Sequence, residues 1–180
     1  TKGYGNIAVL VWDTATQQPR QRLDCGEVRG ISAVTFSPDG TFVAVACQDN
    51  VHTIKLFDWR TGCLRAEVPG GPNKVLNLTF STAKNGPLRI LQGGVEHFRV
   101  LEYDGTLGFT SKLGRFGMKK TNINCAVALP LPAEGGNEFL VGLPNGFVAL
   151  LPLGELTLIG PQPIINGHPV TAMACAVMRE

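Results

Sequence analysis

The side chains of this sequence best suited to catalysis are a serine, an aspartate and a histidine that lie close together in the chain. Ser37, Asp49 and His52 have the chemical types of a nucleophile, an orienting acid and a general base. Catalysis needs these groups to converge on one reacting atom. Turn signals place Ser37 at one end of an expected strand and the other two residues at its opposite end. We therefore predict hydrogen-bonding roles for them and no enzymatic activity.

The histidines and cysteines give no pattern typical of a metal site. The chain has three histidines, His52, His97 and His168, and they have no cysteine or carboxylate partners at metal-ligand spacing. The five cysteines include no C-x-x-C pair. Most of them lie in apolar stretches, where free cysteine packs as a small hydrophobic residue. The expectation is reduced thiols, no metal and no cofactor.

A run of positive charge is the strongest candidate for binding a partner. No aspartate or glutamate occurs between Gly105 and Asn122. Such a segment attracts acidic protein surfaces through long-range electrostatics. The alternative is a solvated loop whose charges only confer solubility. The candidate partner-binding residues in this segment are Lys112, Arg115, Lys119 and Lys120.

Two further motifs match known signals but lack the context that those signals need. Residues Gly114–Gly117 have the G-x-x-G spacing of the KH-domain loop that clamps nucleic acid, but that loop joins helices and strands are expected here. Residues Asn77–Thr79 fit the acceptor pattern for N-glycosylation, but they fall within an expected inner strand. Both are interpreted as chance matches, and no nucleic acid partner is expected.

The composition is that of a chain with an apolar core. The 180 residues are 44% hydrophobic and 17% charged, with a net charge of +2. This excludes a disordered chain, and the charge is too small to indicate nucleic acid or membrane binding by itself. Apolar runs have the length of strands and not of membrane helices. The first residues contain neither an initiator methionine nor an apolar signal region, so we expect a piece of a longer cytoplasmic protein.

A degenerate repeat sets the positions of these side chains. Val11–Asp13 recurs as Leu56–Trp59 and again as Val100–Tyr103, at steps of 45 and 44 residues. Between these copies, Val34–Ser37 has an echo in Leu78–Ser81. A period of roughly 40–45 residues with a Trp-Asp dipeptide is typical of the blades of a WD40 propeller.

Turn signals divide each repeat into four short strands. Ser37–Gly40 and Pro144–Gly146 are strong turn sequences, because asparagine, aspartate and glycine favour the backbone angles of tight turns. Four strands joined by three turns make one propeller blade. The predicted fold class is therefore all-β, a WD40 β-propeller segment with three complete four-stranded blades and partial blades at both ends, the remaining blades coming from the same chain. The expected units are residues 1–30 (last strands of a preceding blade and a crossing loop), 31–74, 75–122 and 123–166 (complete blades), and 167–180 (first strand of the next blade).

Within these blades, polar residues are expected to satisfy buried hydrogen bonds and aromatic residues to pack between sheets. The residues expected to be structural are Trp12, Asp13, Asp39, Gly40, Asp49, Phe57, Asp58 and His168. The phenylalanines expected in the core between blades are Phe36, Phe57, Phe80, Phe98 and Phe147.

In order and spacing, several stretches resemble the echinoderm microtubule-associated protein-like (EMAP-like) family. The most characteristic stretch is Gly105–Phe116, in which a glycine and a short strand precede a turn with lysine, glycine and phenylalanine. The chain departs from the family at Phe57 and Leu101, where tryptophan is common, and in residues 130–137. The stretches are Val9–Thr14, Val34–His52, Ile54–Trp59, Gly105–Phe116 and Ile165–Met178.

The resemblance implies a tandem propeller that associates with microtubules and, in some members, with ciliary axonemes. The chain would then be a non-catalytic protein-interaction module that binds tubulin, microtubules or an axonemal partner, with no membrane partner. Its expected location is the cytoplasm and cytoskeleton, with the cilium or axoneme as the narrower case. The alternative is a WD40 scaffold subunit of another complex, of the trafficking or ubiquitin-ligase type.

Overall fold

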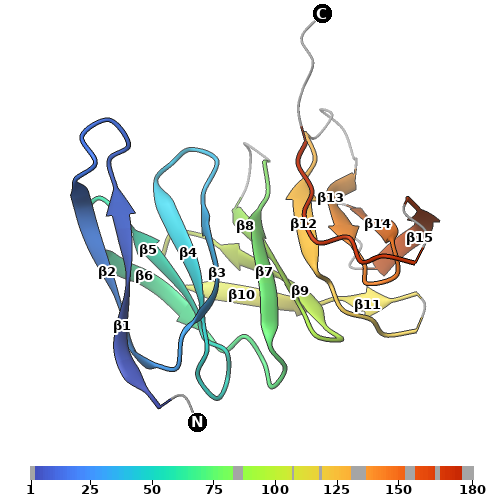
Figure 1. Cartoon of the computed structure of the whole chain (residues 1–180), viewed down its shortest axis with the longest axis horizontal. Coiled ribbons are helices and arrows are strands. Elements are labelled where there is room, and N and C mark those ends of the chain that lie inside the picture. Colours follow the sequence, from blue (N-terminus) through green and yellow to red (C-terminus); the bar gives the residue numbers. More distant parts are fainter. Residues whose placement is uncertain are drawn as a thin grey trace, which may run out of the picture.

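Every regular element in the described part of the chain is a β-strand, as Figure 1 shows. The computed structural model describes residues 3–82, 87–106, 108–117, 119–130, 137–152, 157–164 and 167–175. Its strands form separate twisted sheets that stand side by side, from β1 at the left to β15 at the right (Figure 1). The predicted all-β fold class is confirmed.

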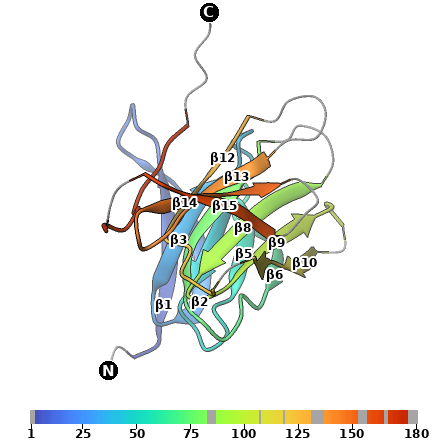
Figure 2. The same cartoon turned by 90° about the vertical axis from the view of Figure 1, so that its right-hand side faces the viewer.

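The described strands form four sheets in chain order. The first is the antiparallel pair β1 (Gly5–Trp12) and β2 (Pro19–Val28). The second contains β3 (Ile31–Phe36), β4 (Phe42–Cys47), β5 (Ile54–Asp58) and β6 (Cys63–Val68). The third contains β7 (Val75–Phe80), β8 (Leu88–Gly94), β9 (Phe98–Tyr103) and β10 (Phe109–Leu113). The fourth contains β11 (Arg115–Phe116), β12 (Cys125–Ala128), β13 (Asn137–Gly142), β14 (Phe147–Pro152) and β15 (Thr157–Pro163), and it lies in front in Figure 2.

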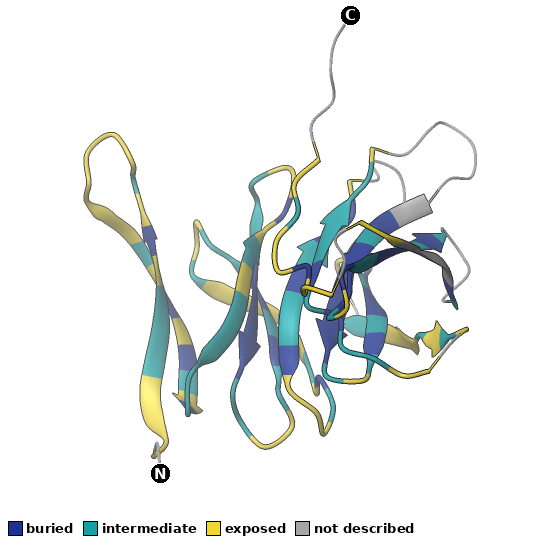
Figure 3. Cartoon of the chain, turned by 45° about the vertical axis from the view of Figure 1, so that its right-hand side comes forward, coloured by how far each residue is buried: buried dark blue, intermediate teal, exposed yellow. Residues whose placement is uncertain are grey.

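The core lies between sheets that face one another. Successive side chains of a strand point to opposite faces, so a strand between two sheets buries both of its faces. In β4, Val43 and Val45 pack toward the first sheet, whereas Ala44 and Ala46 pack toward the third. A further cluster joins the third and fourth sheets around Phe98. This stacking of sheets face to face is the packing of propeller blades, and Figure 3 shows the buried residues along the facing strands.

The structure differs from the sequence expectation around the first crossing loop. Residues 1–30 were expected to end in a crossing loop. This loop is only two residues long, because β2 continues to Val28 and stays paired with β1. A register shift and the positive φ of Gly26, 74°, let the strand continue. The reason is burial, because Cys25 and Val28 both pack into the cluster under β4.

Two other segments also differ from the expectation. The basic segment contains a two-residue strand, β11, which pairs in parallel with Thr157 and Leu158 of β15. Residues 167–175 form no strand, and residues 176–180 of the expected final strand lie outside the described residues. Val170 is nevertheless held, since its N–H donates to the carbonyl of Leu143 at 3.1 Å and its side chain is buried.

The prediction that Phe36 belongs to the core is wrong, because its side chain is 49% exposed. Phe36 lies opposite Val43 in the β3–β4 register and therefore on the face that looks toward the first sheet. The first sheet has only two described strands, which cover Val43 but leave β3 open. The Phe36 ring lies edge-on to Trp59 at 6.4 Å. Trp12, at the end of β1, is likewise exposed.

Candidate functional site

Crossing loops and inner-hairpin turns meet at one end of the sheets, and we call this end the loop face. The connections β2–β3, β4–β5 and β6–β7 lie at the lower edge of Figure 1, near the N-terminus. The loop face comprises the crossing loops 29–30, 69–74 and 114–122 and the turns 48–53, 95–97 and 143–146.

Backbone hydrogen bonds join the crossing loops 29–30 and 69–74 of the loop face to neighbouring turns. The Arg29 N–H donates to the carbonyl of Gln48 at 3.0 Å. The Gly71 N–H donates to the carbonyl of Val51 at 2.9 Å. The Val95 N–H then donates to the carbonyl of Lys74 at 3.0 Å. These bonds satisfy backbone groups that would otherwise need water, and they fix these two crossing loops against the turns 48–53 and 95–97.

The structure brings together three of the four predicted partner-binding residues and separates the fourth. Arg115 lies in β11, and Lys119 and Lys120 follow it, all three exposed on the loop face. Lys112 instead lies within β10, where its ammonium forms an ion pair with Glu102 at 3.7 Å. The sequence showed no acid nearby because Glu102 comes from the adjacent strand, β9.

Two hollows bring these cations next to apolar side chains. The first, of about 490 Å³, is lined by Glu96, His97, Leu113, Gly114, Arg115, Phe116 and Lys120. The second, of about 410 Å³, is lined by Lys119, Lys120, Thr121, Leu143, Pro144, Asn145 and Phe147. Because Lys120 lines both, the hollows are neighbours across the boundary between the third and fourth sheets.

A third hollow, of about 370 Å³, lies where the first crossing loop meets the β4–β5 turn. Here the Arg29 guanidinium lies over the Tyr4 ring, 4.9 Å from its centroid, and also donates to Tyr4 Oη at 2.9 Å. The Asp49 carboxylate accepts the N–H groups of Val51 and Thr53. Burial acts to raise the pKa of Asp49, but the bonds from Thr53 and Val51 outweigh it and hold that pKa below its ordinary value. Asp49 is therefore charged, and its carboxylate is engaged by N–H groups of its own turn.

The charges of the described residues are divided unevenly over the molecule. The loop-face cations Arg29, Lys74, Arg115, Lys119 and Lys120 take part in none of the ion pairs that join described residues. Those pairs lie along the strands and at the opposite end of the sheets. They are Arg20–Asp13, Arg22–Asp24, Lys55–Glu67, Arg65–Asp58, Arg89–Glu102 and Lys112–Glu102.

A buried polar network lies under the loop face. Gln92, which is fully buried, donates from Nε2 to the Gly70 carbonyl at 2.6 Å and contacts His97 Nε2 at 2.9 Å. His97 Nδ1 lies 3.1 Å from the carbonyl of Val95. This geometry puts the imidazole proton on Nδ1, so that Nε2 accepts the bond from Gln92.

The neutral form of His97 should make the stability of the chain depend on pH. Burial lowers the pKa of His97 below 6.5, the carbonyl of Val95 opposes this, and the charges of Arg99 and His52 lower it further. The unfolded chain then binds a proton more readily than the folded chain. The free energy of unfolding should fall as the pH drops below about 6.5 toward the folded-state pKa. In His97→Gln this part of the pH dependence should be absent. Urea denaturation of both proteins from pH 7.5 to 5 would measure it. Identical pH profiles of the two proteins would contradict a lowered pKa of His97 in the folded chain.

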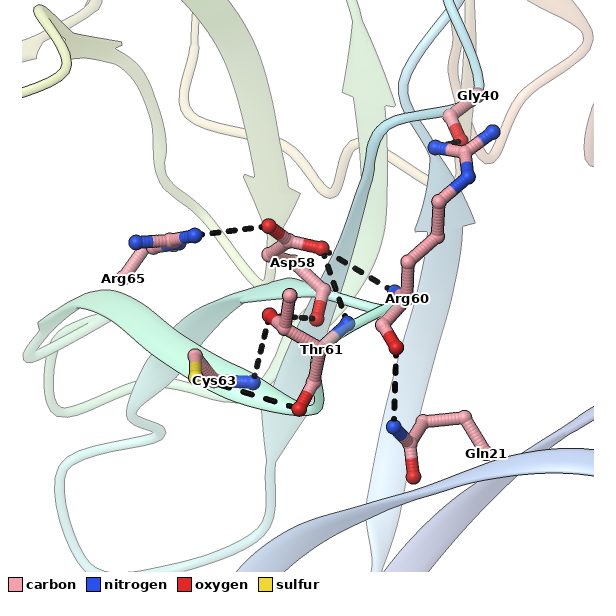
Figure 4. A network of polar contacts seen from close by, with 7 residues as sticks. All are labelled: Gln21, Gly40, Asp58, Arg60, Thr61, Cys63 and Arg65. Carbon is pink, nitrogen blue, oxygen red and sulfur yellow. Dashed lines mark hydrogen bonds and ion pairs between the residues drawn. The ribbon is translucent and has the colours of Figure 1, made fainter.

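At the opposite end of the sheets, turn aspartates bind backbone N–H groups. Asp58 Oδ1 accepts from Arg60 at 3.2 Å and from Thr61 at 3.3 Å, and its Oδ2 pairs with Arg65 at 2.8 Å (Figure 4). The Arg65 guanidinium and the turn hold the pKa of Asp58 below its ordinary value. The Arg60 carbonyl accepts from Gln21 at 3.3 Å, which ties this turn to β2.

Asp13 and Asp39 make similar contacts in their own turns. Asp13 accepts from the N–H groups of Ala15 and Thr16, both at 2.9 Å. Asp39 accepts from the Ser37 hydroxyl at 2.5 Å, so Ser37 is engaged at the far end of β4 from His52. Gly40 supplies the positive φ of this turn, 67°. His168, also among the residues expected to be structural, is exposed.

The structure does not assemble Ser37, Asp49 and His52 into a triad, and its described residues contain no metal-binding group of three or more side chains. Ser37 and His52 lie at opposite ends of β4, so they cannot meet at one reacting atom. No set of three or more histidine, cysteine, aspartate and glutamate side chains converges among the described residues. In that same part of the chain, no helix has the length and apolar character needed to cross a membrane.

Comparison with known proteins identifies the fold and its relatives. No family model matches the chain. The crystal structure of the Myceliophteria thermophila Cps50 (Swd1) β-propeller domain superimposes with a TM-score of 0.72 at 16% identity, over 91% of this chain and 51% of that chain. The ciliary WD repeat-containing protein ctxp80 of Euplotoides octocarinatus is 30% identical over 118 residues, which is 64% of this chain and 16% of the relative. Human EMAP-like protein 3 is 29% identical over 133 residues, which is 68% of this chain and 15% of the relative.

The chain has the fold of a β-propeller segment, and its sequence is similar to those of WD repeat proteins, among them an EMAP-like protein. It spans about a sixth of the length of the curated relatives that it matches. Sequence reasoning missed two features of its loop face, namely the stacking of Tyr4 on Arg29 and the Gln92–His97 network. Tyr4 precedes β1 and Arg29 follows β2, so these two residues meet through the pairing of the two strands, whereas Gln92 and His97 meet through the β8–β9 hairpin.

Proposed function

We propose that the loop face docks this WD40 segment onto an acidic protein surface, with microtubules or an axonemal protein as the first candidates. The observation that carries the proposal is the group of loop-face cations that take part in none of the described ion pairs. The names of the relatives supply the candidates, since one is a ciliary protein and another is microtubule-associated. In this proposal the module is non-catalytic and acts in the cytoplasm, on the cytoskeleton or in the cilium.

Electrostatics of this kind gives encounter rate and orientation more than affinity. Each exposed ion pair contributes roughly 0.2–1 kcal/mol and weakens with salt. Several such pairs, arranged on one rigid face, add up and steer an acidic partner toward it. Backbone bonds to neighbouring turns hold the loops of Arg29 and Lys74, and the pairing of β11 with β15 holds Arg115, so that little ordering of these cations is needed on binding.

Replacing Arg115, Lys119 and Lys120 together by alanine should lower microtubule co-sedimentation several-fold at low salt. The protein would be expressed from its complete gene. Folding should be nearly unchanged, because exposed charges contribute little to stability. A salt titration should remove most of the difference between the variant and the parent protein, since the lost interactions are screened.

A matched control removes the same amount of charge elsewhere. Arg20, Arg22 and Arg65 are exposed cations of β2 and β6 that lie away from the loop face. Their triple alanine variant has the same net charge as the test variant and should pellet with microtubules like the parent protein. Equal pelleting of both triple variants and the parent across the salt titration would show that the loop face is not the docking surface.

A further inference from the structure

One hollow of the loop face combines an apolar lining with a cationic rim. It is the hollow of about 490 Å³ between the third and fourth sheets. Leu113, at the end of β10, lines it and is 65% exposed, more than any other large hydrophobic residue in the described chain. Phe116 of β11 contributes a half-buried ring. Exposed apolar side chains grouped in a concave site favour the binding of an apolar group.

The lining of this hollow is held in place. Gly114 donates its N–H to the carbonyl of Phe98 at 2.9 Å. A Cβ at this position would lie 1.9 Å from the Phe98 ring, so the close approach needs glycine. Phe98 in turn contacts Phe116 edge to face, with ring centres 5.1 Å apart. Because β11 is also paired with β15, the hollow exists before any partner binds.

The rim of the hollow favours negatively charged ligands. Arg115 and Lys120 line the hollow, and Glu96 is the one acidic residue among the described residues that line it. His97 also lines it, but burial lowers its pKa and its Nε2 is engaged with Gln92. Lys120 continues into the neighbouring hollow of about 410 Å³, where Lys119 adds another positive charge.

We propose that this hollow binds one aliphatic or aromatic side chain of an extended, acidic peptide segment. The anchoring side chain packs on Leu113 and Phe116, and carboxylates on either side of it pair with Arg115 and Lys120. The inference rests on the proposed function, to which it adds the chemistry of the bound segment. An oligonucleotide would use the cations but leave Leu113 uncovered, so the exposed leucine favours a peptide.

The test uses two fluorescently labelled, glutamate-rich peptides that differ only in a central leucine or glycine, with the protein expressed from its complete gene. Fluorescence anisotropy should give a dissociation constant about tenfold lower for the leucine peptide, as expected for burying one apolar side chain. In Leu113→Ser this preference should disappear while the glycine peptide binds as before. In Lys120→Gln both peptides should bind more weakly. Thermal melting of Leu113→Ser checks that an exposed side chain has been changed without loss of folding.

The outcomes separate this inference from the proposed function. Equal affinity for the two peptides, or a leucine preference that survives in Leu113→Ser, overturns the anchoring hollow. So does single-stranded RNA that displaces the leucine and glycine peptides equally well, which would assign the cations to nucleic acid. If the leucine preference is found but the triple variant of Arg115, Lys119 and Lys120 pellets normally with microtubules, the peptide-binding hollow is supported and microtubules are not its partner. If pelleting falls but no leucine preference is found, docking of the loop face is supported and the anchoring hollow is overturned.

Discussion

Phe98→Ala should lower the free energy of unfolding by about 3–5 kcal/mol, the usual loss when a buried phenylalanine is truncated. Phe98 is 1% exposed and packs with Leu91 and Phe139 between the third and fourth sheets. The substitution removes the ring that contacts Phe116 and leaves a cavity that the paired strands cannot close. Urea denaturation followed by tryptophan fluorescence and circular dichroism would measure the loss.

Phe36→Ala is the matched control, and it should cost only about 1 kcal/mol. Phe36 is 49% exposed, so only about half of the stabilisation from burying a phenylalanine is available to be lost. The edge contact with Trp59 adds a small contribution. If Phe36→Ala destabilised the protein as strongly as Phe98→Ala, some further part of the protein would have to cover β3 in solution.

The contrast between two phenylalanines shows what a repeat can and cannot predict. Phe36 and Phe80 occupy the same place in successive copies, Val34–Ser37 and Leu78–Ser81. Both lie on the face that looks toward the preceding sheet. Phe80 meets the complete second sheet there and is 4% exposed, whereas Phe36 meets the two-stranded first sheet and is 49% exposed. The repeat predicts the face of each side chain, but burial depends on which strands lie opposite.

The sequence likewise predicted only those features of the candidate site that are formed by residues close together in the chain. The basic segment could be predicted because its charged residues follow one another closely in the sequence. The sequence did not show that Lys112 stands apart from this segment, because Lys112 meets its ion-pair partner Glu102 only through the pairing of β10 with β9. The hollow beside Arg115 was not visible either, since it depends on the approach of Gly114 to Phe98. Interactions that depend on register or on contact between sheets have no local signal.

A last feature beyond the reach of sequence reasoning is the glycine pair that joins three parts of the loop face. Gly70 accepts a hydrogen bond from buried Gln92 at 2.6 Å. The Gly71 N–H donates to the carbonyl of Val51, and the Gly71 carbonyl accepts a hydrogen bond from His52 Nδ1 at 3.0 Å. The second crossing loop is thus fixed both to the β4–β5 turn before it and to the third sheet after it.

Gly70→Ala should therefore destabilise the chain by about 3 kcal/mol, at the upper end of the usual range for overpacking. An added Cβ would lie 2.1 Å from the carbonyl oxygen of His52, which is backbone and cannot rotate away. The loop must shift, and the bond from Gln92 to the Gly70 carbonyl weakens with it. Gly5→Ala is the control, because a Cβ there meets nothing within 4 Å and alanine suits a strand better than glycine by about 0.5–1 kcal/mol. Opposite signs for the two variants in urea denaturation are expected, and a neutral Gly70→Ala would mean that the crossing loop is not packed on the His52 turn.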